Sequence, residues 1–265
     1  MYIVGIILVV IAGILFVARR SQQGKLTEVK FRQTTSAAEL DDLAKAVQSG
    51  TGTTGAFRRD VELKGSIQCD TPLTSEVANL PCVYYSMYVT REYDEAYTET
   101  NPDTKQQERK TRRKSETVAS NTRSTDFWVT DATGRVLVKP QGAKVEAEQV
   151  VDRFEPWKPA IGTKLSVGNF SFDLAAFLNA ANTVGYHFHE NILPLNRAVY
   201  VLGEASDTSG QLAVQKSKEK GPFLISLKSE EEIVKAASSA VQWLMYGAIA
   251  LALAGVALIV IGLIR

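Results

Sequence analysis

Side chains that bind metals or act as nucleophiles are scarce in this sequence, which has two cysteines and two histidines among 265 residues. Two cysteines are too few for a disulfide framework. Cys69, Cys82, His187 and His189 together could complete only one four-ligand zinc site, and no CxxC pair occurs. We therefore expect no bound metal and no disulfide scaffold.

Motifs of catalysis and of nucleotide binding are missing as well. No HExxH, GxSxG or Walker sequence occurs, and no serine or cysteine stands near a histidine in the sequence, although catalytic groups can also assemble from distant residues. The run Gly50–Gly55 spells GxGxxG, but a predicted helix precedes it and a predicted strand follows it, the reverse of the order in a dinucleotide site. This run is predicted to be a flexible loop. We predict no catalytic residue and no cofactor.

The balance of charge excludes a further class of protein. The net charge is +1, whereas dedicated nucleic-acid binders usually carry a basic excess. Nucleic acid is therefore not expected as a partner.

Long apolar runs are present at both ends of the chain. Trp243–Ile264 is uncharged over about 22 residues, and hydrocarbon about 30 Å thick needs roughly 20 in a helix. Trp243 and Tyr246 stand where amphipathic rings favour the headgroup level. Tyr2–Ala18, about 17 residues long, lacks the basic start and the cleavage site of a signal peptide. The sequence predicts two transmembrane helices, with the lipid bilayer as a partner.

The flanking charges predict an orientation. A two-pass protein of the cell (inner) membrane with this charge distribution would hold its middle domain in the cytoplasm, where Cys69 and Cys82 would stay reduced. A long middle segment can also translocate regardless of charge, and outside the cell a disulfide between the two cysteines becomes plausible. The basic residues on the inner side of the spans are Arg19, Arg20, Lys25, Lys30, Arg32, Lys228 and Lys235.

The segment between the spans is predicted to be mainly strand. Ser36–Val47 is a predicted helix with a capping box formed by Ser36 and Glu39. From Phe57 the period changes to two, with Arg59, Glu62, Lys64 and Gln68 alternating with apolar residues in a half-buried strand. Roughly eight strands with one inserted helix indicate an α+β, mainly β domain, built as a small barrel or sandwich. The other predicted strands are 82–91, a hairpin at 127–138, and 164–167, 185–190, 198–204, 211–215 and 223–227; the inserted helix is 172–182.

A polar stretch without an apolar period covers residues 94–124 and is predicted to be a long, mobile hairpin loop. It contains a basic cluster whose attraction to anionic headgroups would be worth about 1 kcal/mol per residue. Glu99, Asp103, Glu108 and Glu116 flank the cluster and weaken its field. A solvated loop is expected, with lipid or nucleic-acid contact as alternatives. The candidate lipid-contact residues are Arg109, Lys110, Arg112, Arg113 and Lys114.

The run His187, His189 and Glu190 is the one group of neighbouring residues that suggests a metal-binding or catalytic site. In a strand, the two histidines share a face and could ligate one metal, whereas Glu190 points to the opposite face. We expect the two imidazoles to be surface or half-buried side chains rather than metal ligands. Glu190 and Glu204 are predicted to be structural carboxylates that accept hydrogen bonds from backbone donors near a turn.

Before the second span, Ser229 with Glu232 forms another predicted capping box, and no helix breaker follows before Met245. Stalk and span are therefore predicted to form one helix of about 35 residues. The predicted segments are 1–20 (first span), 21–56 (juxtamembrane helix and Gly/Thr linker), 57–228 (β-rich domain), 229–242 (stalk) and 243–265 (second span).

Small residues recur in both spans, at Gly5 and Ala12 in the first and at Ala248, Ala252 and Gly255 in the second. Small faces let helices approach closely in lipid. These small residues could simply reflect the ordinary frequency of Ala and Gly. Alternatively, they predict a seam along which the two spans pack, either within one chain or between copies in a homo-oligomer.

Residues 57–228 resemble the GIDE domain of mitochondrial membrane E3 ubiquitin ligases and related prokaryotic proteins. The resemblance rests on Leu63-Lys64-Gly65, on Thr71–Ser75 and on Pro81–Tyr85, and then on Phe127–Asp131 with Gly134. It continues at Gly185-Tyr186 with Glu190 and Leu193-Pro194, at Tyr200–Ala205 and at Phe223–Ser226. The positions that match the family motif are Gly65, Pro72, Leu73, Cys82, Tyr84, Tyr85, Glu190, Gly203 and Glu204.

The resemblance also sets functional expectations. In the ligases, a RING with eight Cys or His ligands follows the second span, and this sequence reaches Arg265 without them, so we expect no ubiquitin transfer by it. In mitochondria the domain faces the intermembrane space, in conflict with the orientation that the charges predict. We expect a non-catalytic binding or scaffold protein that presents the domain to a protein or peptide partner. The alternatives are a lipid-surface sensor that uses residues 109–114 and a metal-dependent or hydrolytic membrane enzyme.

Overall fold

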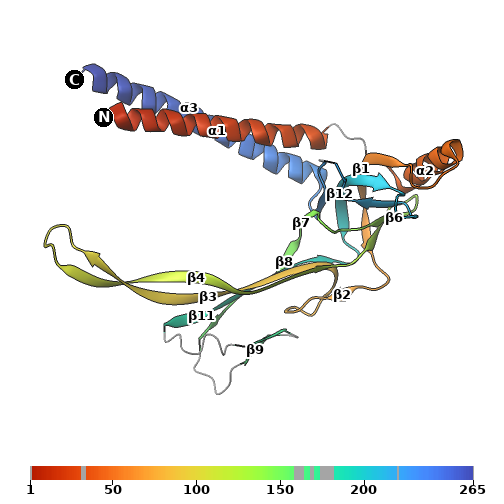
Figure 1. The fold of residues 1–265 in the computed structure, drawn as a ribbon, viewed down its shortest axis with the longest axis horizontal. Helices are drawn as coiled ribbons and strands as arrows, with labels where there is room; N and C mark the ends of the chain where they lie inside the picture. The colour runs from red at the N-terminus through yellow and green to blue at the C-terminus, as the bar shows by residue number, and fades with distance from the viewer. Residues whose placement is uncertain are drawn as a thin grey trace. The chain divides into compact units, whose positions relative to one another are not determined.

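The computed structural model describes residues 2–30, 34–157, 164–167, 170–173, 182–219 and 221–264. Contacts divide the chain into two compact units. One unit comprises Met1–Thr34 with Lys228–Arg265, and the other comprises Thr35–Leu227 (Figure 1).

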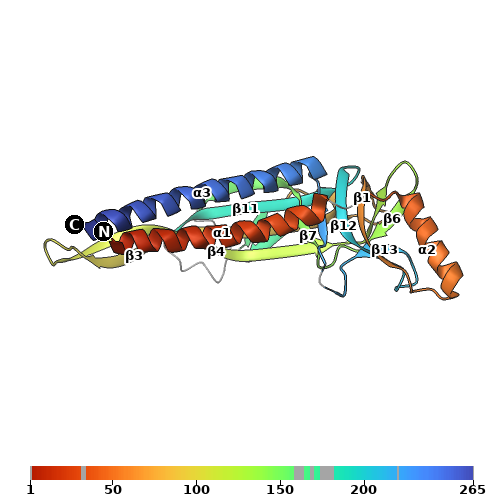
Figure 2. The same ribbon diagram turned by 90° about the horizontal axis from the view of Figure 1, so that it is seen from above.

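The first unit is a pair of long antiparallel helices, α1 (Tyr2–Lys30) and α3 (Glu230–Ile264), which lie side by side in Figures 1 and 2. At the start of α3, the Glu232 amide donates to Ser229 Oγ at 3.2 Å and the Ser229 amide donates to the Glu232 carboxylate at 2.9 Å. The predicted capping box and the continuous helix of stalk and span are both confirmed.

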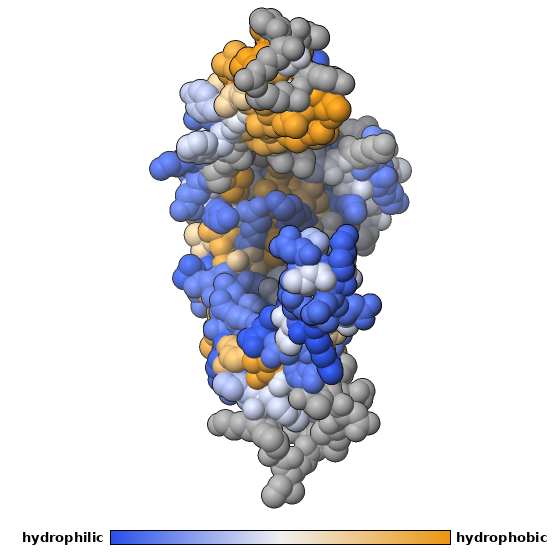
Figure 3. Space-filling view, turned by 90° about the vertical axis from the view of Figure 1, so that its left-hand side faces the viewer, coloured by the Kyte–Doolittle hydropathy of each residue, from blue (hydrophilic) through white to orange (hydrophobic). Residues whose placement is uncertain are grey.

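The two predicted membrane spans are helices whose apolar side chains are mostly exposed. The segments Ile3–Arg20 and Val241–Gly262 are long and apolar enough to cross a bilayer, and only 11% of each is buried in the structure. A helix from the core of a soluble protein would be mostly buried. Figure 3 shows the hydrophobic surface of the helix pair. The two helices fit a two-pass membrane protein.

Small residues form a seam between α1 and α3. A Cβ atom on Gly5 would lie 2.7 Å from the carbonyl oxygen of Gly255, and one on Gly255 would lie 2.8 Å from that of Gly5. Ala12 and Ala248 are buried as well. The predicted packing seam therefore joins the two helices of one chain, and homo-oligomerisation stays a prediction.

A small closed β-barrel forms one half of the second unit. Its strands are hydrogen-bonded in the ring β1–β5–β6–β13–β12, and β12 pairs back with β1. Strand β12 also pairs with β14, which continues to β7. The prediction of a mainly β domain with a barrel is confirmed. The strands are β1 (Arg58–Gln68), β5 (Phe127–Thr130), β6 (Arg135–Val138), β7 (Lys144–Glu146), β12 (Ala198–Ser206), β13 (Ala213–Gln215) and β14 (Leu224–Ser226).

Helix α2 (Ala37–Thr51) packs on the barrel through the buried side chains Leu40 and Ala44. Ser36 Oγ accepts the Glu39 amide at 3.3 Å, as predicted for the N-cap. The helix continues through Gly50 and ends at Thr51, with Gly52 as its C-cap at a φ of 67°. The prediction that Gly50 starts a flexible GxGxxG loop is therefore wrong for its first two residues, which still make helical bonds.

The other half of the second unit is an open sheet built on β3 (Pro81–Thr100). One edge of β3 pairs with β11 (Thr183–Pro194), which pairs in turn with β8 (Glu148–Pro156). The other edge pairs first with β2 (Leu73–Thr74) and then with β4 (Gln107–Ser124).

The Asp94 amide still donates to the Asn182 carbonyl at 2.8 Å. Beyond Asp94, β3 is paired only with β4 among the described residues, and the two strands run on as a ribbon that extends past the rest of the sheet (Figure 1). We call Asp94–Ser115 the arm. The prediction of a mobile loop over 94–124 is wrong: only the tip, Asn101–Gln106, is a turn. The arm has no apolar period because charged side chains, rather than a buried face, fill its cross-strand positions.

Three further points differ from the sequence-based expectations. The sequence pattern does not predict strands β7 and β8. Glu62, expected on the solvent side of its strand, is buried and accepts the Tyr200 hydroxyl at 3.0 Å. Phe172 and Asp173, expected to begin a helix, end β10 (Phe170–Asp173), which pairs with β9 (Lys164–Val167). Of the rest of that predicted helix, Asn182 lies in a turn and 174–181 lies outside the described residues.

Candidate functional site

Glu190 holds a loop in place beneath the open sheet. Its carboxylate is fully buried and accepts three backbone amides: those of Glu76 and Val77 at 2.9 Å on one oxygen, and that of Ala78 at 2.8 Å on the other. The loop also closes on itself, because the Ser75 amide donates to the Leu80 carbonyl at 2.9 Å. The prediction that Glu190 serves backbone donors near a turn agrees with this geometry.

The clamped loop places Glu76 in a polar network. The Tyr85 hydroxyl donates to Glu76 at 3.0 Å, and the Asn121 amide donates to the same oxygen at 2.5 Å. Burial and the hydrogen bond to Glu76 raise the pKa of Tyr85. Tyr85 is therefore neutral at physiological pH and acts as a hydrogen-bond donor.

Cys82 and Cys69 lie in different parts of the second unit. Cys82 is buried with Tyr85 and Ile192 under the sheet, whereas Cys69 packs against the barrel core, and both are free thiols. Burial, with a smaller effect of the Glu190 charge, raises the pKa of Cys82 to about 11. A thiol with so high a pKa is a poor nucleophile, which argues against a catalytic role for Cys82.

Two glycines of the family motif lie where the chain passes close to a neighbour. A Cβ on Gly65 would lie 2.5 Å from the Thr130 carbonyl oxygen, and one on Gly203 would lie 2.8 Å from the Phe223 ring. Glu204 accepts the Ser217 hydroxyl at 2.7 Å, and no backbone amide among the described residues donates to it, which differs from its predicted role. Of the other motif positions, Leu73 packs with Cys82, and Tyr84 packs against the barrel. These contacts stabilise the fold, so the motif positions indicate a shared fold rather than a shared active site.

His187 and His189 lie on the face of β11 opposite Glu190, with ring centroids 4.2 Å apart. The structure adds Asp152 of β8 to them: its Oδ1 lies 2.5 Å from His187 Nε2 and 3.6 Å from His189 Nδ1. Burial and the neighbouring His187 lower the pKa of His189, although Asp152 acts in the opposite direction. Both imidazoles are half-buried. We call these three residues the His–Asp cluster.

Asp152 could not be found from local sequence, because it stands 35 residues before His187 on a strand that the sequence pattern does not predict. The register pairs His189 with Asp152 across β11 and β8. Residues 152–155 alternate neither in polarity nor in burial, so only the register of β8 against β11 brings Asp152 to the histidines.

The basic residues of the arm pair with acidic residues of the opposing strand. Lys110 lies 2.7 Å from Glu99, and Arg112 and Lys114 lie 2.6 and 2.8 Å from Glu95. The Arg112 guanidinium also lies 5.0 Å from the centre of the Tyr97 ring. On the other face, Arg113 pairs with Asp94 at 3.1 Å, and Arg109 faces Thr98 in the register. The predicted lipid-contact cluster is thus one side of a cross-strand charge ladder.

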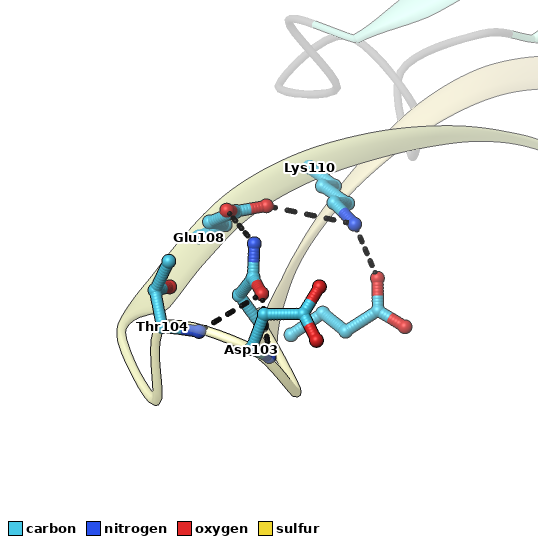
Figure 4. A network of polar contacts seen from close by, with 6 residues as sticks. Asp103, Thr104, Glu108 and Lys110 are labelled. Atoms are coloured by element: carbon cyan, nitrogen blue, oxygen red, sulfur yellow. Dashed lines mark hydrogen bonds and ion pairs between the residues drawn. The ribbon is translucent and has the colours of Figure 1, made fainter.

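The tip of the arm is a polar turn (Figure 4). Asn101 accepts the amides of Asp103 and Thr104, and its own side-chain amide donates to Glu108 at 2.7 Å. Glu108 lies 3.6 Å from Lys110, which links the turn to the charge ladder (Figure 4). The arm is ordered by polar contacts along its length.

A family model described as "GIDE: E3 Ubiquitin ligase" matches residues 96–261. The match begins in β3 and ends in α3, so it contains Glu190, Gly203 and Glu204 and leaves the motif positions from Gly65 to Tyr85 before it. No curated protein and no solved structure matches the chain. Because the matched residues are more than half of the sequence, the chain belongs to the GIDE family.

Proposed function

We propose that this protein is a membrane-anchored, non-catalytic binding module whose arm receives an extended, acidic segment of a protein partner along the outer edge of β4. The observation that carries the proposal is that edge. Among the described residues, β4 is hydrogen-bonded on one side only, to β3, over 18 residues. An extended peptide can add to such an edge through main-chain hydrogen bonds.

The side chains of β4 favour an acidic partner strand. On one face of the arm, Lys110, Arg112 and Lys114 lie on β4, and their acidic partners lie on β3. An acidic strand on the outer edge would place this basic row between two acidic ones, and opposite charges across strands stabilise a sheet by about 0.2–1 kcal/mol per pair. A second copy of β4 would instead bring basic residues opposite basic ones.

The same charges do not favour a lipid surface. Residues 92–116 contain seven acidic and six basic side chains, so the net charge of this segment is −1. Attraction to an anionic membrane depends on net charge over about a Debye length, whereas strand addition depends on the charges nearest the edge. We therefore favour a peptide over a lipid headgroup.

Membership of a ligase family does not change this proposal. A RING needs eight Cys or His ligands for its two zinc ions, and these 265 residues contain four such side chains in all. The proposal accordingly does not include ubiquitin transfer by these residues.

Binding of a synthetic peptide to the full chain in detergent micelles tests the proposal. The probe is a labelled peptide with the sequence of residues 92–100, which carries four acidic side chains, and its fluorescence anisotropy reports binding. We expect saturable binding that Lys110→Glu with Arg112→Glu weakens about tenfold, since the two reversals turn attractive pairs into repulsive ones. The exposed pair Lys216→Glu with Lys218→Glu, outside the arm, should leave the affinity unchanged.

Two control peptides separate strand addition from charge attraction. A peptide with lysine at its acidic positions should not bind. A peptide with N-methylated backbone amides keeps every charge but cannot form the main-chain ladder, and it should lose binding as well. Equal binding of the methylated and unmethylated peptides would contradict strand addition.

We also propose that the second unit faces the cytoplasm, on the strength of the basic flanks Arg19, Arg20 and Lys228. The turn at Asn101–Gln106 contains the exposed Lys105, and exposed turns are preferred sites of proteolytic cleavage. Trypsin should cut there in inverted inner-membrane vesicles and not in intact spheroplasts. Cleavage in spheroplasts alone would place the unit outside.

A further inference from the structure

The His–Asp cluster is a group of metal-ligating side chains outside the surface used by the proposed function. Asp152, His187 and His189 each offer one ligand atom, and these atoms all lie within 4.8 Å of one another. Among the described residues, no other group of His, Cys, Asp and Glu side chains meets this geometry.

The spacing of the three atoms suits a single ion. Zinc binds histidine nitrogen and carboxylate oxygen at about 2.0–2.2 Å, so the ligands of a tetrahedral zinc stand roughly 3.3–3.5 Å apart. The two separations from Asp152 Oδ1, 2.5 Å to His187 Nε2 and 3.6 Å to His189 Nδ1, lie on either side of that value. The third separation, between the ligand atoms of the two histidines, is at most 4.8 Å.

The imidazoles are held in place by neighbours that need no metal. The Tyr88 ring stacks on His189 with centroids 4.5 Å apart and planes 18° apart, and the Phe154 ring meets His187 edge-on at 6.2 Å. Gln149 Nε2 lies 3.5 Å from His189 Nδ1, a contact that a metal ion bound to this nitrogen would replace. The next strand residues, Phe188 and Glu190, are buried on the opposite face. A rigid strand with fixed ring orientations reduces the ordering cost of ligation.

We propose that Asp152, His187 and His189 form a binding site for one divalent transition-metal ion of the zinc class. Two neutral imidazoles and one carboxylate are ligands of the kind that zinc takes at sites with an open fourth position. That position faces solvent here, since Asp152 is 55% exposed and both histidines are partly exposed. A metal was not expected from the sequence, because a histidine pair alone supplies only two ligands; Asp152 supplies the third.

The proposal does not depend on binding of a peptide by the arm, which uses other residues. The ion would bridge two neighbouring strands, β8 and β11, and would therefore stabilise the sheet by mass action when bound. Three protein ligands leave a place for water or for a donor from a partner molecule.

Metal titration of the full chain, purified in detergent without a histidine tag and stripped with a chelator, tests the site. We expect one zinc ion per chain by calorimetry, and Co²⁺ in its place should give the intense visible absorption of a tetrahedral site. Asp152→Asn, His187→Asn and His189→Asn should each weaken zinc binding at least about tenfold, because even changes in outer-shell groups cost 10–100-fold. Glu155→Gln on the opposite face of β8 is the matched control and should bind as the wild type does.

Unfolding temperatures keep the test decisive if a variant is less stable. Zinc should raise the unfolding temperature of the wild type and of Glu155→Gln, and it should not raise that of His187→Asn with Asp152→Asn. Without metal, the double variant should retain the wild-type circular dichroism spectrum. No stoichiometric zinc in the wild type, or equal binding by the double variant, would overturn the proposal.

Discussion

Replacing Glu190 with alanine is expected to lower the free energy of unfolding of the second unit by roughly 3–5 kcal/mol. The substitution removes the acceptor of three amides, those of Glu76, Val77 and Ala78, from a buried position. Hydrogen bonds to charged groups contribute about 1.5–3 kcal/mol each, and a buried donor left without a partner costs about 1–3 kcal/mol. Partial access of water to the loop keeps the total below the sum of these terms. Thermal or denaturant unfolding of the full chain in detergent measures the loss.

Glu190→Gln gives the graded control. Its remaining carbonyl oxygen can still accept the amides of Glu76 and Val77, but its NH₂ group would face the amide of Ala78, where two donors meet. We expect a loss between zero and that of the alanine variant, about 1–3 kcal/mol.

Hydrogen exchange locates the effect in the loop. The amides of residues 76–78 should exchange faster in both variants, and those of the β5–β6 hairpin should be little changed below the unfolding transition. An alanine variant with wild-type stability and unchanged exchange at 76–78 would show that the carboxylate does not hold the loop.

The parts of the fold that local patterns determine could be predicted from the sequence. The two spans follow from uncharged length, and the cap at Ser229 follows from a serine three residues before a glutamate. The hairpin at 127–138 follows from alternation around the turn Asp131–Gly134, where the Asp131 amide donates to the Gly134 carbonyl at 2.9 Å. In each case the residues that specify the structure are neighbours in the chain.

The arm could not be predicted because the contacts that order it cross between strands. Lys110 and Glu99 are 11 residues apart, and Arg112 and Glu95 are 17 apart. A strand whose two faces both carry charged side chains has no apolar period, and by composition it is indistinguishable from a solvated loop. Each exposed pair contributes at most about 1 kcal/mol, so the long main-chain ladder with β3 is the larger contribution.

The candidate site likewise combines a feature that the local sequence predicts with one that depends on contacts between strands. Placement of His187 and His189 on one face follows from the two-residue period of a strand. Addition of Asp152 requires the register of β8 against β11, and a register is set by the whole sheet rather than by the sequence of one strand. Glu62 is a similar case, because its burial depends on Tyr200 of β12, 138 residues away.

Gly65→Val is expected to destabilise the barrel by roughly 3 kcal/mol or more, and Gly65→Ala by about 1–3 kcal/mol, as overpacked side chains do. Both variants are destabilised because a side chain has no room at this position, and not because the backbone has a conformation that only glycine adopts. Strand β1 pairs with β12 up to Ser66, the residue at which its pairing with β5 begins. A Cβ on the preceding Gly65 would lie 2.5 Å from the carbonyl oxygen and 2.9 Å from the carbonyl carbon of Thr130. Because the obstacle is backbone, a side-chain rotation cannot relieve it, and the β1–β5 pairing that helps to close the ring must move.

Gly50→Ala provides a control of opposite sign within the same unit. Gly50 lies in α2, and among the described residues no atom outside its own stretch of helix lies within 4 Å of the position that a Cβ would take. Alanine there should raise stability by up to about 1 kcal/mol, the difference in helix propensity between the two residues. Unfolding curves of the two variants should therefore move to opposite sides of the wild-type curve. If Gly65→Ala were as stable as the wild type, the close approach of Thr130 could not be the reason for glycine at this position, and closure of the barrel would have to tolerate a wider corner between β1 and β5.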